Sequence, residues 1–294
     1  MSELPATESL DPATAAIDRL DGVELAHVLV ESHRGAVDAA LAATSAIAQA
    51  IALVASALER GGRVVAIGAG TSGRLAVLDA SELPPTFGVD ARLFDARIAG
   101  GDDALRRAIE GAEDDASAGA RSVDDVGEGD VAIGVSASGN APFVVSALRA
   151  ARSRGARTVA IVNAAASGLA AQADVAIVAA TGAEPIQGST RMRAGTAQKI
   201  VLNAISTGAM IALGKTYGNR MVDLVASNAK LRSRAERLVR ELGATADPRA
   251  ALEAAGGSVK TAVVMLRRGA GRAEAERLLR EANGRLGRVI DDPA

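Results

Sequence analysis

The run RVVAIGAGTSGR, residues 63–74, is the most informative about the fold. Its first half is a short, β-branched apolar segment that ends at Gly68. Its second half is a turn of glycine, serine and threonine that leads into a helical pattern near 72–82. A strand that passes through such a turn directly into a helix is typical of a parallel strand–helix–strand unit. This stretch therefore predicts an α/β fold.

The same pattern recurs along the chain. Further short apolar runs lie at 92–95, 130–135, 158–163 and 175–179. Helical patterns separate them near 103–121, 141–154 and 166–172. Apolar residues run continuously through these strands rather than alternating with polar ones, which indicates a sheet covered on both faces. We therefore expect a three-layer fold around a five-stranded, mainly parallel sheet.

The segments before and after the predicted sheet have mostly helical patterns. Residues 1–22 are polar and irregular, 23–58 predict one or two long apolar helices, and 191–213 and 219–242 predict two more. Asp247 and Pro248 mark a boundary, after which three short helical patterns remain. The expected organisation is an amino-terminal arm with helices over 1–60, a central domain over 61–247 and a small helical domain over 248–294.

Composition excludes several classes of protein. The 294 residues carry 33 Lys and Arg against 35 Asp and Glu, a net charge of −2, and show no basic patch typical of a nucleic-acid binder. Cysteine is absent, which removes disulfides and thiolate-ligated metals, and the only histidines are His27 and His33. No apolar run is long enough to span a membrane, and no secretory signal is recognised. We expect a cytoplasmic protein.

Hydroxyl-rich turns follow two of the predicted strands. GAGTSGR (68–74) follows the first, SASGNAP (136–142) follows the third, and GSTRMRAGT (188–196) opens the helix over 191–213. The carboxyl ends of parallel strands share one edge of the sheet, where open α/β sheets bind ligands. Backbone N–H groups at a helix start, together with hydroxyls, suit a phosphate. These turns favour a phosphorylated small molecule over a dinucleotide, although each alone is also compatible with an ordinary helix cap.

The paired turns resemble those of the SIS (sugar isomerase) domain, a phosphosugar-binding α/β fold. GAGTSGRLAVLDASELPPTFG (68–88) and GSTRMRAGTAQK (188–199) are more specific and resemble the N-acetylmuramic acid 6-phosphate etherase family. The resemblance extends over nearly the whole chain, including EGAED (110–114) and GNRMVDLVASNAKL (218–231). It implies a carbon–oxygen lyase that acts on a phosphorylated amino sugar and releases D-lactate, without metal or cofactor. The apolar helices over 23–58 and 191–213 separately suggest a homodimer, since they offer more apolar surface than one monomer covers.

The resemblance also implies residue roles. Two catalytic carboxylates map onto Glu82, as the acid that protonates the departing lactate, and Glu113, as the base at C2 of the sugar. Pro84 and Pro85 are expected to end the helix that carries Glu82, and Glu113 is expected in an acidic helix. The expected substrate and phosphate contacts are Gly70, Thr71, Ser72, Ser136, Ser138, Gly139, Asn140 and Ser189.

Other interpretations stay open on the sequence alone. Arg191, Lys199 and Glu184 lie in family-like strings, and Glu184 is expected to hold a sugar hydroxyl or a partner loop. An SIS-type isomerase would use the same phosphate turns without an acid at the C3 oxygen. A non-catalytic phosphosugar sensor would need neither carboxylate, but residues 1–60 show no basic helix-turn-helix.

Overall fold

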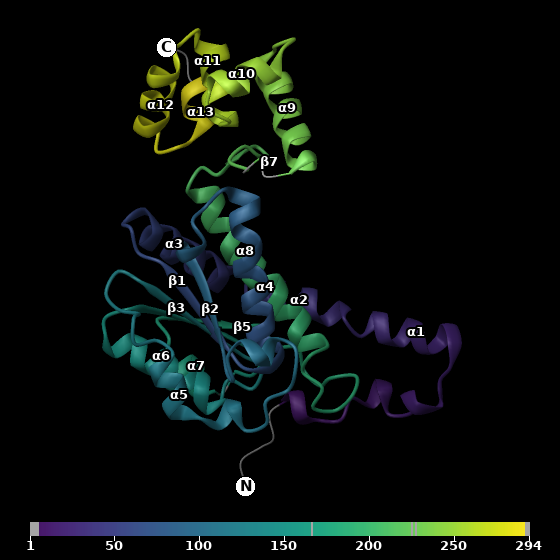
Figure 1. Cartoon of the computed structure of the whole chain (residues 1–294). Coiled ribbons are helices and arrows are strands. Elements are labelled where there is room, and N and C mark those ends of the chain that lie inside the picture. Colours follow the sequence, from purple (N-terminus) through teal and green to yellow (C-terminus); the bar gives the residue numbers. More distant parts are fainter. Residues whose placement is uncertain (1–5, 166, 225, 227, 292–294) are drawn as a thin grey trace. The chain divides into compact units, whose positions relative to one another are not determined.

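The computed structural model describes residues 6–165, 167–224, 226 and 228–291 (Figure 1). The chain forms two compact units. The first contains the residues up to Ser81 together with Arg92–Ser206, and the second contains Glu82–Ala91 together with the residues from Thr207 onward. The domain boundaries expected at residues 60 and 247 stay predictions of the sequence.

A five-stranded sheet forms the centre of the first unit. Its strands pair in the order β2-β1-β3-β4-β5, and every pair is parallel. The strands are β1 (Val64–Gly68), β2 (Phe94–Ile98), β3 (Val131–Ser136), β4 (Arg157–Val162) and β5 (Val175–Val178). The α/β class and the five-stranded parallel sheet are confirmed. Because Gly68 of β1 pairs with Val135 of β3, the turns that follow these two neighbouring strands start side by side.

Helices cover the sheet on both faces, which explains the continuous apolar strands. Alternate side chains of β1 point to opposite sides. Val65 and Ile67 pack into a core shared with α6 (Pro142–Ser153) and α7 (Gly168–Ala171). Val64 and Ala66 instead lie with residues of α4 (Gly70–Phe87) and α8 (Arg193–Ala212). The sheet is therefore the middle of three layers.

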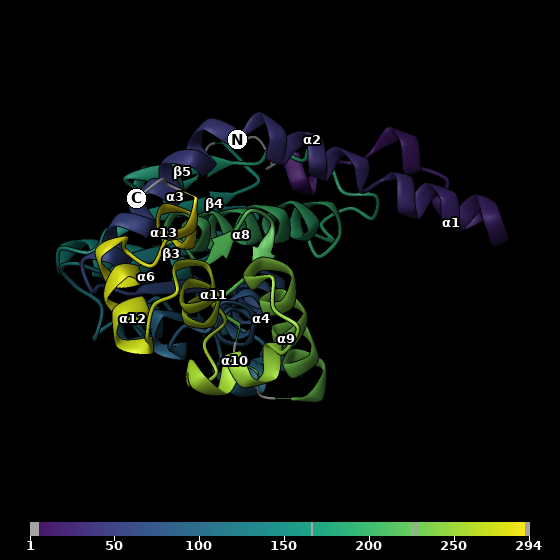
Figure 2. The same cartoon turned by 90° about the horizontal axis from the view of Figure 1, so that it is seen from above.

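The amino-terminal part of the chain forms three helices rather than the one or two expected. They are α1 (Gly22–Glu31), α2 (Arg34–Ala42) and α3 (Thr44–Glu59), preceded by three short 3-10 turns. Figures 1 and 2 both show α1 extending away from the sheet. None of its ten residues is buried within the described chain, and Val23 is 88% and Val30 75% exposed. This helix leaves an apolar surface uncovered.

Two local predictions are wrong. Helix α4 does not end at Pro84 and Pro85 but includes both and continues to Phe87. The helix expected over 103–121 is mostly absent: this segment forms two 3-10 turns, Asp102–Leu105 and Ala112–Asp114, and a short helix α5, Ala116–Arg121. Gly111 adopts a φ of 72°, which a right-handed helix does not allow, so the helical pattern is interrupted before Glu113.

The second unit is mainly helical. A hairpin of β6 (Thr216–Tyr217) and β7 (Arg220–Met221) precedes α9 (Ala229–Gly243), so the helix expected over 219–242 starts later than predicted. Four helices follow where three were expected. They are α10 (Pro248–Ala254), α11 (Val259–Arg268), α12 (Arg272–Glu281) and α13 (Leu286–Ile290), and they share one core with α9 (Figure 2).

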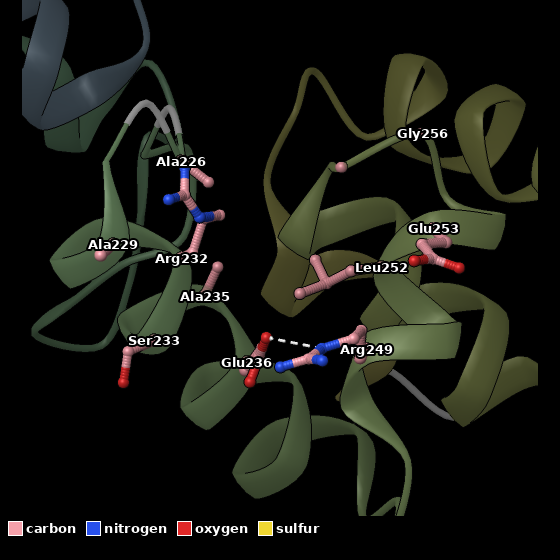
Figure 3. Close-up of a pocket in the computed structure, with 11 residues that line it drawn as sticks. Ala226, Ala229, Arg232, Ser233, Ala235, Glu236, Arg249, Leu252, Glu253 and Gly256 are labelled. Atoms are coloured by element: carbon pink, nitrogen blue, oxygen red, sulfur yellow. Dashed lines mark hydrogen bonds and ion pairs between the residues drawn. The ribbon is translucent and has the colours of Figure 1, made fainter.

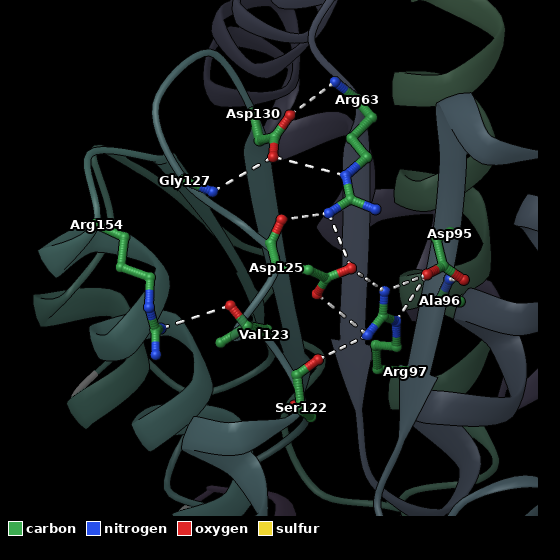
Figure 4. A network of polar contacts seen from close by, with 10 residues as sticks. All are labelled: Arg63, Asp95, Ala96, Arg97, Ser122, Val123, Asp125, Gly127, Asp130 and Arg154. Carbon is green, nitrogen blue, oxygen red and sulfur yellow. Dashed lines mark hydrogen bonds and ion pairs between the residues drawn. The ribbon is translucent and has the colours of Figure 1, made fainter.

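A network of ion pairs lies beside β1 and β2 in the first unit (Figure 4). Asp125 accepts hydrogen bonds from Arg63 at 2.9 Å and from Arg97 at 3.1 Å. Arg97 also pairs with Asp95, and Asp130 accepts the backbone N–H of Arg63 at 3.0 Å. The network ties Arg63, just before β1, and the side chain of Arg97 in β2 to the loop before β3.

Among the described residues, no single helix has both the length and the apolar composition needed to cross a membrane. A bent pair, Gly22–Ala42 with Thr44–Glu59, passes that test only when its two parts are joined.

Candidate functional site

A cavity of about 420 Å³ lies at the carboxyl edge of the sheet, where β1 and β3 end. Five segments of the first unit line it: the amino-terminal arm, the turn after β1, the loop that carries Glu113, the turn after β3, and the loop before α8. The three hydroxyl-rich segments of the sequence therefore meet around one space. This is the candidate functional site.

Most of the predicted site residues line this cavity. They are Gly70, Thr71, Ser72, Glu113, Ser136, Ser138 and Asn140. Gly139 lies within the second turn but not in the wall, and Ser189 lies between two wall residues, Gly188 and Thr190. Glu82 is exposed on α4, belongs to the second unit, and is not among the lining residues.

Glycines let the first turn fold back tightly onto its helix. A Cβ on Gly68 would lie 2.5 Å from the backbone nitrogen of Gly73, so no larger residue fits there without a shift. Helix α4 starts at Gly70, with a φ of 53°, one residue after the strand ends. The first N–H groups of a helix have no partner within it. The turn therefore presents backbone donors and the positive end of an 18-residue helix to the cavity.

The second turn is held by its own serines. The Ser136 hydroxyl oxygen accepts the N–H of Gly139 at 3.1 Å, and that of Ser138 accepts the N–H of Asn140 at 3.3 Å. Asn140 in turn accepts the N–H of Gly168 at 2.9 Å through its side-chain oxygen. These bonds occupy lone pairs of the serines and leave their hydroxyl protons available.

A buried amide pair that the sequence analysis did not identify stands behind the cavity. Ser72 donates from its hydroxyl to Oε1 of Gln198 at 2.8 Å. Gln198 donates from Nε2 to Oδ1 of Asn163 at 2.9 Å, and Asn163 donates from Nδ2 to the carbonyl of Ala179 at 2.8 Å. Gln198 and Asn163 are each 1% exposed. Asn163 follows the apolar run of β4, but Gln198 lies among polar residues, next to Lys199, so its position in the sequence gives no sign of its burial.

The loop with Glu113 is attached to the first turn by Arg74. This side chain donates to the carbonyl oxygens of Leu105 at 3.3 Å and Arg107 at 3.1 Å. Glu113 lies in a 3-10 turn rather than the expected helix, and it is exposed beside the cavity together with Asp114. A solvent-accessible carboxylate at the cavity wall is able to exchange a proton with a bound molecule.

The amino-terminal arm supplies two lining residues that were not predicted, Thr7 and Glu8. The Thr7 hydroxyl is fully buried and has no hydrogen-bond partner among the described residues. Buried polar atoms are nearly always satisfied, so an unpaired hydroxyl at a cavity wall points to a ligand atom or a water. The backbone of Glu8 is held by Gln187, which donates to its carbonyl at 2.8 Å.

Glu184 serves the fold rather than the sugar or partner contact expected from the sequence. Its side chain is 1% exposed, and its two carboxylate oxygens accept the N–H groups of Arg193 and Ala194, each at 2.8 Å. Both N–H groups belong to the first turn of α8, so Glu184 caps that helix. Arg193 also reaches Asp11 of the arm at 3.2 Å.

The remaining candidates lie along or near α8. Arg191 is exposed, and Lys199 donates to Asn203, which itself donates to Asp79 at 2.5 Å. Burial raises the pKa of Asp79, and hydrogen bonds from Asn203 and Ser206 oppose that shift. His33 contacts Thr196 at 2.8 Å through Nδ1. None of these side chains is part of the cavity wall.

The second unit has a larger cavity, of about 840 Å³, between α9 and α10 (Figure 3). Its wall combines small apolar residues with Arg232, Glu253 and an ion pair of Arg249 with Glu236 at 3.2 Å. Figure 3 shows this ion pair bridging the two helices. None of the predicted site residues lines this cavity.

Comparison with known proteins identifies the family. The chain matches the model of the SIS domain over residues 110–207 and that of the glucokinase regulatory protein N-terminal SIS domain over 46–152. It is 48% identical to the N-acetylmuramic acid 6-phosphate etherase of Deinococcus radiodurans, over 99% of this chain and 97% of that protein. The chain belongs to the N-acetylmuramic acid 6-phosphate etherase family.

Other members of the etherase family align over similar lengths. The Geobacillus thermodenitrificans protein is 45% identical over 99% of this chain and all of its own length. The Symbiobacterium thermophilum protein is 50% identical over 88% of each chain. Among solved structures, a candidate phosphosugar isomerase involved in capsule formation from Bacteroides fragilis superposes with a TM-score of 0.50 at 19% identity, over 64% of this chain and 90% of that one. That likeness confirms the SIS fold, as the sequence resemblance implied.

Proposed function

We propose that this protein is a lyase that cleaves the D-lactyl ether of N-acetylmuramic acid 6-phosphate, giving N-acetylglucosamine 6-phosphate and D-lactate. The observation that carries the proposal is the cavity at the carboxyl edge of the sheet, where two hydroxyl-rich turns and a helix start come together with a carboxylate. Relatives that align over nearly the full chain bear the name of this activity.

The chemistry needs one base and one acid. In the open-chain sugar, the C2 proton is acidic because it lies next to the C1 aldehyde. A carboxylate removes this proton, the C3–O bond breaks, and the lactate oxygen takes a proton from the acid as it leaves. Water then adds across the new C2–C3 double bond, with its oxygen on C3. The acid and the base must each hold the right protonation state for its step.

We assign Glu113 as the base and Glu82 as the acid. Glu113 is exposed at the cavity wall, which supports its role at C2. The assignment of Glu82 rests on the family resemblance of SELPP (81–85). For the phosphate we propose the N–H groups at the start of α4, around Gly70 and Thr71, with the hydroxyls of Ser136 and Ser138 in the turn after β3.

A second copy of the chain is part of this proposal. Helix α1 has no buried residue within the described chain, and Leu41 of α2 is 66% exposed, so apolar surface remains for a partner. We expect a homodimer, which light scattering tests. Replacing Val23 and Val30 together by serine is expected to shift the protein toward monomer. The cytoplasmic location also stays a prediction.

The decisive experiment measures D-lactate released from N-acetylmuramic acid 6-phosphate by the purified protein. Glu82→Gln is expected to lose lactate release by about 100-fold or more, yet to keep exchange of the C2 proton with deuterium, since only the acid is missing. Glu113→Gln is expected to lose both. Glu110→Gln, an exposed carboxylate of the same segment outside the cavity wall, is the matched control and is expected to keep both.

Each alternative has its own outcome in this experiment. Proton exchange at C2 with no lactate from the wild-type protein would indicate an SIS-type isomerase. Binding of the sugar phosphate with neither exchange nor lactate would indicate a sensor, as in a regulatory protein. Turnover of the Glu82→Gln variant at the wild-type rate would rule out Glu82 as the acid.

A further inference from the structure

The hydrogen bonds behind the cavity fix the direction of the Ser72 hydroxyl. They begin at Ala179, whose backbone carbonyl is only able to accept. Asn163 must therefore turn its NH₂ group toward this carbonyl, at 2.8 Å, which leaves its Oδ1 facing Gln198. An oxygen needs a donor, so the amide nitrogen of Gln198 faces Asn163, at 2.9 Å.

The chain of hydrogen bonds ends at Ser72 in the cavity wall. With its nitrogen on Asn163, Gln198 directs Oε1 toward Ser72, at 2.8 Å. Ser72 has one proton, and this contact uses it. What Ser72 still offers is the lone pairs of its oxygen. If the hydroxyl turned away, Oε1 of a side chain that is 1% exposed would lose its donor, which is unfavourable.

Ser136 and Ser138 are arranged the opposite way. Each accepts a backbone N–H inside its own turn, from Gly139 and Asn140 respectively, and keeps its hydroxyl proton. The wall thus has a donor side at the turn after β3 and an acceptor at Ser72. A phosphate dianion has no proton to give, so it suits the donors, whereas a sugar hydroxyl or amide N–H suits Ser72.

We propose that Ser72 determines specificity by accepting a hydrogen bond from the sugar part of the ligand, not by donating to its phosphate. Gln198 and Asn163 are then positioning residues that act through Ser72. The ligand class, a phosphorylated amino sugar, rests on the proposed function, but the direction of the hydrogen bond does not.

The test compares two probes, N-acetylglucosamine 6-phosphate and inorganic phosphate, by calorimetry and by displacement of the first by the second. Ser72→Ala is expected to weaken binding of the sugar phosphate about fivefold and to change that of inorganic phosphate less than about twofold. Ser138→Ala is the matched control from the donor side of the wall. It is expected to weaken the binding of both probes about tenfold. Equal weakening of both probes by Ser72→Ala would overturn the proposal.

A second variant tests the positioning residues. Gln198→Met has a similar volume and releases the Ser72 proton, so the hydroxyl is free to turn toward an anion. We expect this variant to strengthen the binding of inorganic phosphate relative to the binding of the sugar phosphate by about fivefold. A merely structural loss would weaken both probes by the same factor, and that result would count against the proposal. Circular dichroism and thermal melting establish that each variant is folded.

The outcome separates this proposal from the proposed function. Suppose that the wild-type protein binds both probes and the variants change that binding as expected, but the wild-type protein releases no lactate. The etherase activity is then refuted, and the assignment of Ser72 stands. If lactate is released while Ser72→Ala weakens both probes equally, the activity stands and the assignment of Ser72 fails. If the wild-type protein binds neither probe, the assignment fails as well.

Discussion

A buried polar side chain can bond backbone groups of the fold rather than a ligand. Glu184 illustrates this because both of its oxygens cap the first turn of α8 from a position that is 1% exposed. The sequence resemblance marked Glu184 as a candidate site residue, and only its contacts distinguish the two roles. A carboxylate next to a helix start is favourable for the helix whether or not a ligand is present.

We expect Glu184→Ala to lower the free energy of unfolding by about 3 kcal/mol. The substitution removes two hydrogen bonds to a charged acceptor, each worth roughly 1.5 kcal/mol or more, and leaves two N–H groups at the buried start of α8 without a partner. Urea unfolding measures this change.

Asn228→Ala is the control for a helix cap. Asn228 is exposed and accepts one N–H, that of Leu231 at 2.9 Å, at the start of α9. Its loss is expected to cost about 1 kcal/mol. If the two variants lost equal stability, the second hydrogen bond of Glu184 and its burial would add nothing to the effect of an ordinary cap.

For individual residues, sequence patterns located most of the cavity wall, but neither the part that the amino-terminal arm supplies nor the residues behind the wall. Thr71, Ser136 and Ser138 were found because hydroxyls next to glycine at strand ends form a pattern. Gln198 was missed because its role depends on contacts with residues 126 and 35 positions away in the chain, Ser72 and Asn163. Thr7 was missed because an arm of 3-10 turns has no periodicity that predicts where it lies.

Among the elements, the turn between β3 and α6 depends on a glycine. Gly139 has a φ of 70°, and a Cβ placed on it would lie 2.3 Å from the Cβ of Ser167. Its carbonyl also accepts the N–H of Leu169 at 2.9 Å. This turn holds Ser138 in place at the cavity wall, so its shape affects both stability and binding.

Gly139→Ala is expected to lower the free energy of unfolding by about 3 kcal/mol. About 1–2 kcal/mol comes from forcing a residue with a Cβ into the left-handed region, and the rest comes from the clash with Ser167. The variant is also expected to weaken sugar phosphate binding. Thermal melting and calorimetry test the two effects.

Gly269→Ala separates the two causes. Gly269 has a φ of 62° and a ψ of 28°, in the left-handed region, but a Cβ added there would meet no described atom within 4 Å, so only the backbone cost of about 1–2 kcal/mol is expected. An equal loss in both variants would mean that Ser167 moves aside freely.

Strands were easier to predict than the segments between them. Four of the five strands lie within a residue of their expected bounds, because five-residue apolar runs bounded by turn residues have few alternatives. β2 was placed at 92–95 and lies at Phe94–Ile98, since Asp95 and Arg97 interrupt its apolar run. In α4, the helix continues through Pro84 and Pro85 to Phe87 despite the preference of proline for a helix end.

For the chain as a whole, the network shown in Figure 4 is one source of stability that acid removes. Burial alone would raise the pKa of Asp125, but hydrogen bonds and ion pairs with Arg97 and Arg63 outweigh it and lower the pKa to about 2. The folded chain therefore binds fewer protons at Asp125 than the unfolded chain between its ordinary pKa of 3.8 and about 2. The stability from this group is complete above the ordinary pKa and is lost as the pH falls toward 2.

We expect Asp125→Asn to lower the free energy of unfolding by about 1 kcal/mol at pH 6, a modest value because the side chain is 52% exposed and solvent screens its pairs. The difference between variant and wild type is expected to shrink when urea unfolding is repeated near pH 2.5.

Asp103→Asn provides the comparison at an exposed pair. Asp103 lies 3.6 Å from Arg107, and both side chains are more than three-quarters exposed. Its loss is expected to change stability by less than about 0.5 kcal/mol at either pH. A pH-independent difference for Asp125→Asn would show that the ion pairs are not the source of its effect.

The buried amides behind Ser72 have a consequence for how this fold diversifies. Gln198 is outside the cavity wall, yet its contact with Ser72 determines whether this wall hydroxyl donates a hydrogen bond to a ligand or accepts one from it. Exchange of this one residue would alter ligand preference while every wall residue stayed the same. Relatives with matching cavities but a different residue at this position would thus prefer different ligands, and comparisons limited to ligand-facing positions would overlook the change.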